Sequence, residues 1–307
     1  MKHSLVDARP TVGFDIGGTR CRAALVSPGG GILGQRSVPT PDTAAELEDA
    51  IVTLVGDLRD GDPGAVGLAV AGFLDPQRET VRFAPHLPWR DSAVRARMEE
   101  RLGLPVVMEH DANAAAWGEY RFGAAQGAGT WVYFAVGTGI GAALMIDGRI
   151  YRGAYGTAPE FGHLTVVPDG RACSCGKKGC LERYASGTAL ADHAARHGLS
   201  AQWDGPALFA GARQGEERSR QVVAEFGRWL GLGLGMVVDV LDPELIVLGG
   251  GVATDADLFL DAARTEMAAT IVGAGHRRLP DVGTAELGVS AGMIGVADIA
   301  RTTTHKE

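Results

Sequence analysis

The sequence predicts an α/β protein built from two mixed domains with a cleft between them. Short apolar runs alternate with segments of helical periodicity, and each half opens with a strand that turns at glycines, pairs with the next strand and is followed by helices. The 307 residues are enough for two domains of ordinary size. Because ligands usually bind in clefts between domains, we expect the binding site there.

The first half supplies the elements of one domain. An apolar run at 12–16 ends at glycines and is followed by a second apolar run at 21–26, which is typical of a β-hairpin. Leu47, Ile51 and Leu54 recur at helical spacing. The further elements expected in this half are strands at 66–70 and 105–108 and helices at 44–58, 92–102 and 112–122.

The second half repeats this organisation. Residues 131–136 and 141–146 form a second hairpin-like pair around Gly137-Thr138-Gly139. The long apolar and glycine-rich segment 219–241 is typical of a buried helix. The remaining elements expected here are a strand at 245–248 and helices at 256–271 and from about Ala291. A first domain boundary is expected near residues 115–120.

Composition excludes several classes of protein. Hydrophobic residues make up 46% and charged residues 21%, the balance of a soluble globular chain. The formal net charge of -8 argues against a broad nucleic-acid-binding surface. The N-terminus has no apolar run of signal-peptide length, and no segment offers eighteen uninterrupted apolar residues. We therefore expect a cytoplasmic protein that binds neither nucleic acid nor membrane.

Three of the four cysteines lie within eight residues of one another. These are Cys173, Cys175 and Cys180, and His163 precedes them by ten positions. Three thiolates and one imidazole make a complete tetrahedral set for a structural zinc ion. A disulfide would leave an odd thiol, and a surface loop with chance cysteines is the other alternative. A closed set of four protein ligands leaves no open position for a zinc hydrolase.

Three glycine turns at strand ends indicate phosphate binding. Backbone N–H groups in such turns can point at phosphate oxygens, although a single glycine after a strand is usually only a turn. The pattern is not a Walker loop, and it lacks the acidic residue of a dinucleotide fingerprint. Asp15 is suited to hold hydrated Mg²⁺. The turns are Asp15-Ile-Gly17-Gly18-Thr19, Gly137-Thr138-Gly139-Ile-Gly141 and Gly249-Gly250-Gly251.

Asp111 is the candidate catalytic residue. It stands where the strand at 105–108 has ended and the helix at 112–122 begins. On local grounds it is equally an N-cap or a catalyst, since a carboxylate at this position can accept hydrogen bonds from the first helical turn.

The chain resembles the ROK family of sugar kinases, most of all its glucokinases, over essentially its whole length. The resemblance rests on motifs that appear in the family order: Asp-Ile-Gly-Gly-Thr, Glu-His-Asp-Ala-Asn-Ala-Ala-Ala, Gly-Thr-Gly-Ile-Gly, Glu-Phe-Gly-His, Cys-x-Cys-Gly-x-x-Gly-Cys-x-Glu and Val-Leu-Gly-Gly-Gly. It implies two ribonuclease-H-like domains of the actin/hexokinase-like ATPase class. It also implies that the last helix returns to the first domain, which gives domains at 1–118 with about 291–307 and at 119–290.

The resemblance also implies a role for each motif. Asp111 becomes the general base that takes the proton from the sugar 6-hydroxyl as it attacks the γ-phosphate of ATP, with Mg²⁺ as cofactor. His163 would bind zinc with one nitrogen and face the sugar with the other, so that the metal holds the sugar-binding residues in place. Sugar-binding positions are Gly72, His110, Asp111, Glu160, His163 and Glu182. Nucleotide-binding positions are Asp15, Gly17, Gly18, Thr19, Arg20, Gly137, Thr138, Gly139, Gly249, Gly250 and Gly251.

Departures from the family pattern leave the sugar open. His110 stands where asparagine is usual, His86 where Pro-Asn is common, and Arg20 replaces a frequent lysine. Glucose is expected first, with mannose, fructose, N-acetylglucosamine and N-acetylmannosamine as alternatives. The ROK repressors carry a helix-turn-helix before the first strand, and here the first strand begins near Thr11. A non-catalytic sensor would be expected to lack Asp111. The phosphoryl donor, ATP or polyphosphate, is open, and a homodimer or homotetramer is expected.

Overall fold

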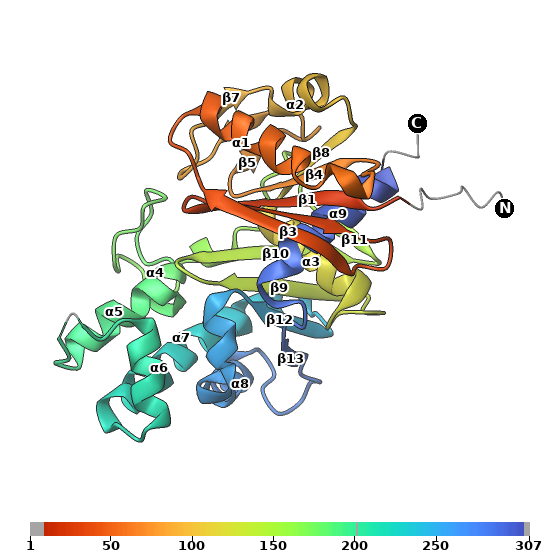
Figure 1. Cartoon of the computed structure of the whole chain (residues 1–307). Coiled ribbons are helices and arrows are strands. Elements are labelled where there is room, and N and C mark those ends of the chain that lie inside the picture. The colour runs from red at the N-terminus through yellow and green to blue at the C-terminus, as the bar shows by residue number, and fades with distance from the viewer. Residues whose placement is uncertain (1–8, 201, 304–307) are drawn as a thin grey trace. The chain divides into compact units, whose positions relative to one another are not determined.

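The computed structural model of the protein describes residues 9–200 and 202–303. The chain divides into two compact units (Figure 1). The first comprises Met1–Gly127, Ala143–Pro159 and Val289–Glu307, and the second comprises Ala128–Ala142 and Glu160–Gly288.

The first unit is built on a five-stranded mixed sheet with the order β3-β2-β1-β4-β8. Strands β1, β2 and β3 are antiparallel neighbours, whereas β4 and β8 run parallel to β1. A small sheet, β5-β6-β7, follows β4 in the chain. The bounds are β1 Thr11–Ile16, β2 Arg20–Val26, β3 Ile32–Pro39, β4 Val66–Val70, β5 Phe73–Leu74, β6 Val81–Phe83, β7 Arg90–Ser92 and β8 Val106–His110.

One face of this sheet carries the main hydrophobic core. Alternate residues of β1, among them Phe14 and Ile16, are buried with residues of α1 and α2. The α1 helix is capped by Thr43, whose side chain accepts a hydrogen bond from the Glu46 N–H. The helices and 3₁₀ turn of this unit are α1 Ala44–Gly56, η1 Arg59–Gly61, α2 Val94–Leu102, α3 Asp111–Phe122 and α9 Ala291–Thr303.

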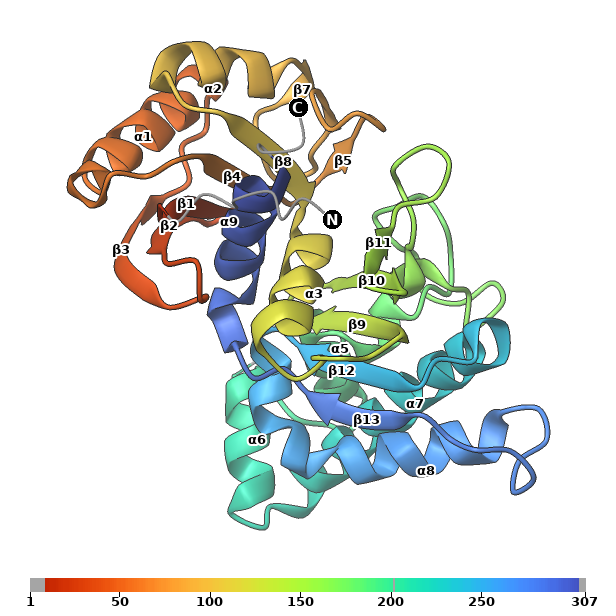
Figure 2. The same cartoon turned by 90° about the vertical axis from the view of Figure 1, so that its right-hand side faces the viewer.

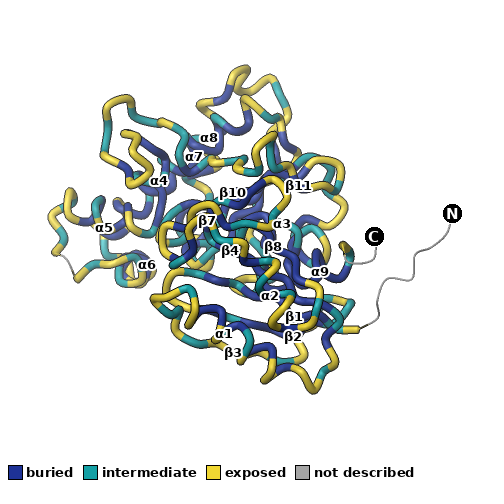
Figure 3. Tube along the Cα trace, turned by 90° about the horizontal axis from the view of Figure 1, so that it is seen from above, coloured by how far each residue is buried: buried dark blue, intermediate teal, exposed yellow. Residues whose placement is uncertain are grey.

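The opposite face is closed by the last helix of the chain. Gly13 and Gly67 are paired across β1 and β4, and a Cβ on either would lie within 2.3 Å of a backbone oxygen of α9. Only glycine allows the helix to approach the sheet this closely. Figure 2 shows α9 beside β1 and β4, and ten of its residues are buried (Figure 3).

The second sheet has the order β11-β10-β9-β12-β13. β12 pairs in parallel with both β9 and β13. The strands are β9 Thr130–Val136, β10 Ile140–Ile146, β11 Arg149–Tyr151, β12 Leu245–Gly249 and β13 Asp281–Thr284. The helical elements are η2 Phe161–His163, α4 Glu182–Ala185, α5 Gly187–Arg196, α6 Gly205–Arg213, α7 Glu217–Leu241, η3 Gly251–Leu258, α8 Leu260–Thr270 and η4 Gly288–Ser290.

Several helices differ from the sequence expectation, and α1 and α7 do so only by two residues at one end. The segment 256–271 is not one helix, because η3 ends before Phe259 and α8 begins after it. The Phe259 ring is buried edge-on against Phe226, at 5.0 Å between ring centroids, and the chain turns there. Ser92 belongs to β7, so α2 starts two residues later than expected. Among the described residues, none of the helices has both the length and the apolar character to cross a bilayer.

Candidate active site

Three strand ends of the first unit bring candidate residues to one edge of the sheet. The register pairs Ile16 with Val70 and Val70 with His110 along three parallel strands. The residues that follow these strand ends are therefore neighbours. The sequence-predicted residues gathered here are Asp15, Gly17, Gly18, Thr19, Gly72, His110 and Asp111.

Asp15 and Asp111 are close enough to influence each other electrostatically. Burial raises the pKa of Asp15, the Arg22 guanidinium opposes this, and the charge of Asp111 raises the pKa further. Arg22 stands opposite Asp15 in the antiparallel register and forms an ion pair with it. Arg22 was missed in the sequence, although a charged residue inside an apolar strand was a signal for it. Two neighbouring carboxylates at strand ends favour a cation.

Asp111 is the first residue of α3, and His110 occupies the N-cap position without a capping hydrogen bond from its side chain. Asp111 Oδ1 accepts a hydrogen bond from the Ala112 N–H at 2.7 Å. His110 Nδ1 lies 3.3 Å from the same oxygen. The Asp111 side chain is 41% exposed. Its carboxylate is thus oriented by the first turn of the helix and remains open to a ligand.

Glu109 is a buried carboxylate directly before these two residues. Arg152 donates to Glu109 Oε2 at 2.5 and 3.0 Å, and Arg78 donates to the same oxygen at 3.2 Å. Glu109 Oε1 accepts from the Asn113 side chain at 3.0 Å and from the His110 N–H at 3.1 Å. Burial would raise the pKa of this carboxyl, but the two guanidinium groups and the Asn113 amide outweigh it and lower the pKa. The cluster, which sequence reasoning missed, fixes the backbone around the start of α3.

The first glycine turn is held by its neighbours in the same unit. The Thr40 hydroxyl donates to the Gly17 carbonyl at 2.6 Å. A Cβ on Gly18 would stand 2.5 Å from Cβ of His86, so the His86 loop lies against the turn. Arg20 begins β2 and donates to the Ser37 hydroxyl at 3.3 Å. Only a glycine fits at position 18.

The other two glycine turns follow neighbouring parallel strands of the second unit. Gly249 pairs with Ala135, so Gly137-Thr138-Gly139 and Gly249-Gly250-Gly251 leave the same sheet edge. Gly250 has a φ of 83°, which glycine adopts readily. The first residues of α5 are hydrogen-bonded to the turn Gly137-Thr138-Gly139. The Gly187 N–H donates to the Gly137 carbonyl at 2.7 Å, and the Thr188 hydroxyl donates to the Thr138 carbonyl at 2.7 Å. A helix N-terminus beside a turn of this kind favours an anion.

Glu160, His163 and Glu182 also lie in the second unit. His163 Nε2 is 3.8 Å from Glu160 Oε2. Glu182 Oε2 accepts a hydrogen bond from the Ile140 N–H at 2.9 Å. Its Oε1 lies 3.9 Å from Cys173 Sγ. Both acidic side chains therefore lie beside the histidine and cysteine cluster.

The side chains of His163, Cys173, Cys175 and Cys180 converge on one point. One ligand atom from each lies within 4.8 Å of all the others. His163 turns Nδ1 toward Cys173 Sγ, at 3.7 Å, and Cys175 and Cys180 have their sulfurs 3.6 Å apart. Burial and the two neighbouring thiols raise the pKa of Cys180 to about 12. For Cys175, burial raises the pKa, but a hydrogen bond with the Lys177 backbone and contacts with the other two thiols outweigh it and lower the pKa. Three thiols and one imidazole that converge in this way fit a cation that accepts thiolates.

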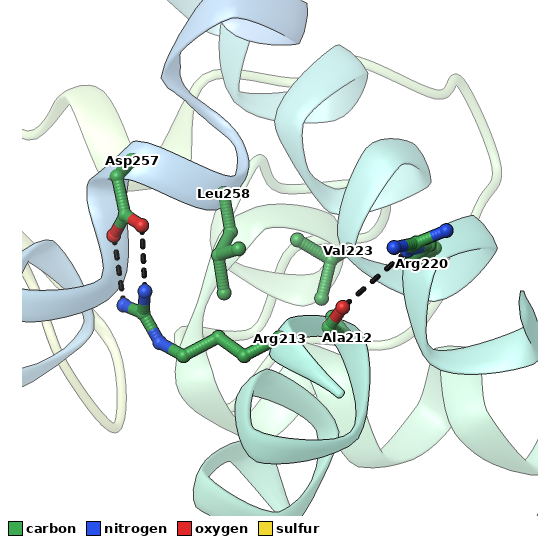
Figure 4. Close-up of a pocket in the computed structure, with 6 residues that line it drawn as sticks. All are labelled: Ala212, Arg213, Arg220, Val223, Asp257 and Leu258. Atoms are coloured by element: carbon green, nitrogen blue, oxygen red, sulfur yellow. Dashed lines mark hydrogen bonds and ion pairs between the residues drawn. The ribbon is translucent and has the colours of Figure 1, made fainter. Parts of the chain in front are cut away.

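A separate pocket of about 550 Å³ lies among α6, α7 and η3 (Figure 4). Arg213 donates to both carboxylate oxygens of Asp257, at 2.6 and 2.8 Å, and to Asp255. Arg220 donates to the Ala212 carbonyl at 3.4 Å. None of the sequence-predicted residues lines this pocket, and its Arg213 charge is already neutralised.

The chain matches a known protein family over nearly its whole length. The sequence model described as the ROK family matches residues 11–303. The chain belongs to the ROK family. Its sequence is 41% identical to that of a glucokinase of Streptomyces coelicolor over 308 residues. The aligned region covers 95% of this chain and 97% of that relative.

Two ROK crystal structures have the same fold. A ROK glucokinase from Streptomyces griseus, in complex with glucose and AMPPNP, matches with a TM-score of 0.87 and 41% identity over 95% of this chain and 99% of that chain. The ROK hexokinase from Thermus thermophilus matches with a TM-score of 0.82 and 34% identity over 97% and 100%. These matches confirm the predicted α/β, actin/hexokinase-like fold class.

Proposed function

We propose that this ROK protein is a glucokinase that transfers the γ-phosphate of ATP to the 6-hydroxyl of glucose. The observation that carries the proposal is the pair of carboxylates at one sheet edge, Asp111 exposed at the start of α3 and Asp15 in the first glycine turn. The 41% identity to glucokinases over nearly the whole chain supports it. ATP and glucose would be the substrates of this reaction, and Mg²⁺ would be its cofactor.

Asp111 is proposed as the general base. An ionised carboxylate within hydrogen-bond reach can take the proton of the sugar hydroxyl as that oxygen attacks phosphorus. Most of the rate enhancement is expected from alignment of the reacting atoms. For the sugar, we propose contacts with Gly72, His110, Glu160, His163 and Glu182.

The phosphate chain of ATP is proposed to contact the three glycine turns. The positive end of the α5 dipole beside the second turn and the hydroxyl of Thr19 add to the backbone N–H groups there. Asp15 is proposed to hold hydrated Mg²⁺, which neutralises phosphate charge when bound. The electrostatic proximity of the Asp15 and Asp111 carboxylates supports a cation at this position.

We infer that His163, Cys173, Cys175 and Cys180 hold one zinc ion. The convergence of the four ligand atoms supports this, and the closed ligand set gives zinc a structural role. His163 Nδ1 faces the cluster and Nε2 faces Glu160. Zinc would therefore fix the ring orientation of a residue that contacts sugar. Metal analysis should find one zinc per chain, and loss of zinc in Cys175→Ser but not in Cys21→Ala would locate it.

A coupled assay tests the kinase. Glucose, mannose, fructose, N-acetylglucosamine and N-acetylmannosamine are supplied with ATP and Mg²⁺, and ADP release is measured. Turnover is expected with glucose first, and Asp111→Asn should abolish turnover while glucose still binds in calorimetry. If no sugar is turned over, or Asp111→Asn stays active, the proposal fails. Polyphosphate in place of ATP tests the donor.

The cytoplasmic location and the homodimeric or homotetrameric state remain predictions. Size-exclusion chromatography with light scattering measures the mass of the particle and tests the oligomer directly.

A further inference from the structure

The two oxygens of Asp111 have different surroundings. Oδ1 accepts a hydrogen bond from the Ala112 N–H and lies 3.3 Å from His110 Nδ1. Within residues 9–200 and 202–303, Oδ2 has neither a hydrogen bond nor an ion pair. An oxygen that already accepts from a helix N-terminus and has a ring nitrogen 3.3 Å away is the weaker proton acceptor. The proton of a substrate is therefore expected at Oδ2.

Three arginine side chains of the first unit already have carboxylate partners. Arg22 forms an ion pair with Asp15, and Arg78 and Arg152 both donate to Glu109. The His110 ring lies beside Oδ1, and the backbone N–H of His110 donates to Glu109 Oε1 at 3.1 Å. The buried Glu109 cluster thus holds the backbone of His110, and His110 faces Asp111.

We propose that His110 is a positioning residue for Asp111: Nδ1–H of His110 engages Oδ1 and leaves Oδ2 as the oxygen that takes the proton. This inference rests on the proposed kinase function. The O–H bond of the sugar hydroxyl breaks as the Oδ2–H bond forms. The hydroxyl oxygen forms the new bond to the γ-phosphorus of ATP, and the bond from that phosphorus to the bridging oxygen breaks to release ADP.

Two substitutions of His110 separate this role from sugar contact. In His110→Asn the side-chain amide nitrogen takes the place of Nδ1, whereas in His110→Gln it takes the place of Nε2. We expect His110→Asn to retain most of kcat with a higher KM for glucose. We expect His110→Gln to lower kcat by up to about 10²-fold, because a misplaced reacting group costs this much. A fall of kcat in His110→Asn alone, or an equal fall in both variants, overturns the proposal.

Controls distinguish this inference from the proposed function. Wild-type turnover of glucose and its loss in Asp111→Asn must hold first; if they fail, the kinase assignment is wrong. If they hold and His110→Gln keeps the wild-type kcat, only the role of His110 is wrong. His276→Gln, at an exposed histidine of the second unit, is expected to match the wild type. Circular dichroism of each variant verifies that it folds.

A second measurement needs no variant to be active. In protein labelled with ¹⁵N-histidine, the ring shifts of His110 report which nitrogen carries the proton. The signal is identified by its loss in His110→Asn. We expect the tautomer protonated at Nδ1 at neutral pH. A ring protonated at Nε2 alone would leave no donor toward Oδ1 and would contradict the proposal.

Discussion

Glu182 lies directly over Gly139. A Cβ on Gly139 would stand 2.3 Å from Glu182 Oε2, the oxygen that accepts the Ile140 N–H. A predicted sugar-binding carboxylate and a predicted phosphate turn are therefore in contact within the second unit. Substitution at one should disturb the other.

Gly139→Ala should weaken glucose binding. The new methyl would displace the flexible end of Glu182 and break its hydrogen bond to the Ile140 N–H, while the backbone need not move. We expect KM for glucose to rise about tenfold, which corresponds to losing about 1.4 kcal/mol of such a bond. Gly56→Ala, where an added Cβ meets nothing within 4 Å, is the control. An unchanged KM in Gly139→Ala would show that Glu182 does not contact the sugar.

Arg152→Met should destabilise the protein through Glu109. The substitution removes the closer of two guanidinium groups from a buried carboxylate, which can cost about 3 kcal/mol in free energy of unfolding. The double variant Arg152→Met/Glu109→Gln should regain much of this stability, because no unpaired charge remains. Urea denaturation measures the free energy of unfolding of the single and the double variant. Equal stability of the single and double variants would argue against an ionised Glu109.

Acid should unfold the protein partly through Glu225. Burial raises the pKa of Glu225, but hydrogen bonds and charges from His197, His193 and their neighbours outweigh it and lower the pKa to about 2. A lowered carboxyl pKa gives stability above the unfolded value of 4.5 that is lost as pH falls toward 2. Glu225→Gln should therefore flatten the decline of stability between pH 4.5 and about 3.

Buried His193 acts in the same direction at higher pH. Burial lowers its pKa below 6.5, so the unfolded chain takes up the proton first and stability falls as pH drops below 6.5. Urea titrations of the wild type and Glu225→Gln from pH 7 to pH 3 measure how the free energy of unfolding depends on pH. Parallel curves for the two proteins would rule out a contribution of Glu225.

Removal of the metal should weaken glucose binding more than ATP binding. Without a ligand on Nδ1, the His163 ring loses the contact that fixes its orientation toward Glu160. Chelator-treated protein is expected to show a higher KM for glucose and a lower melting temperature, both restored by Zn²⁺. Kinetics and melting that stay the same in verified metal-free protein would contradict this role.

Much of the fold could be predicted from the sequence because its signals are local. Apolar runs ending at glycines located β1, β9 and β12, and helical spacing located α1. The strand β3 and the helices α5 and α6 were missed, and so were the short elements, among them α4, β13 and the small β5-β6-β7 sheet. Such short elements hold too few residues to show a period.

The sequence by itself determined which chemical groups are available and where along the chain they stand: Asp111 at a strand end, the glycine turns, and the clustered cysteines with His163. Only the tertiary structure decided their partners. Arg22 meets Asp15 through strand register, and Arg152 reaches the buried Glu109 from a distant segment. The reason is physical, because side chains far apart in sequence meet through packing and register, which local patterns do not encode.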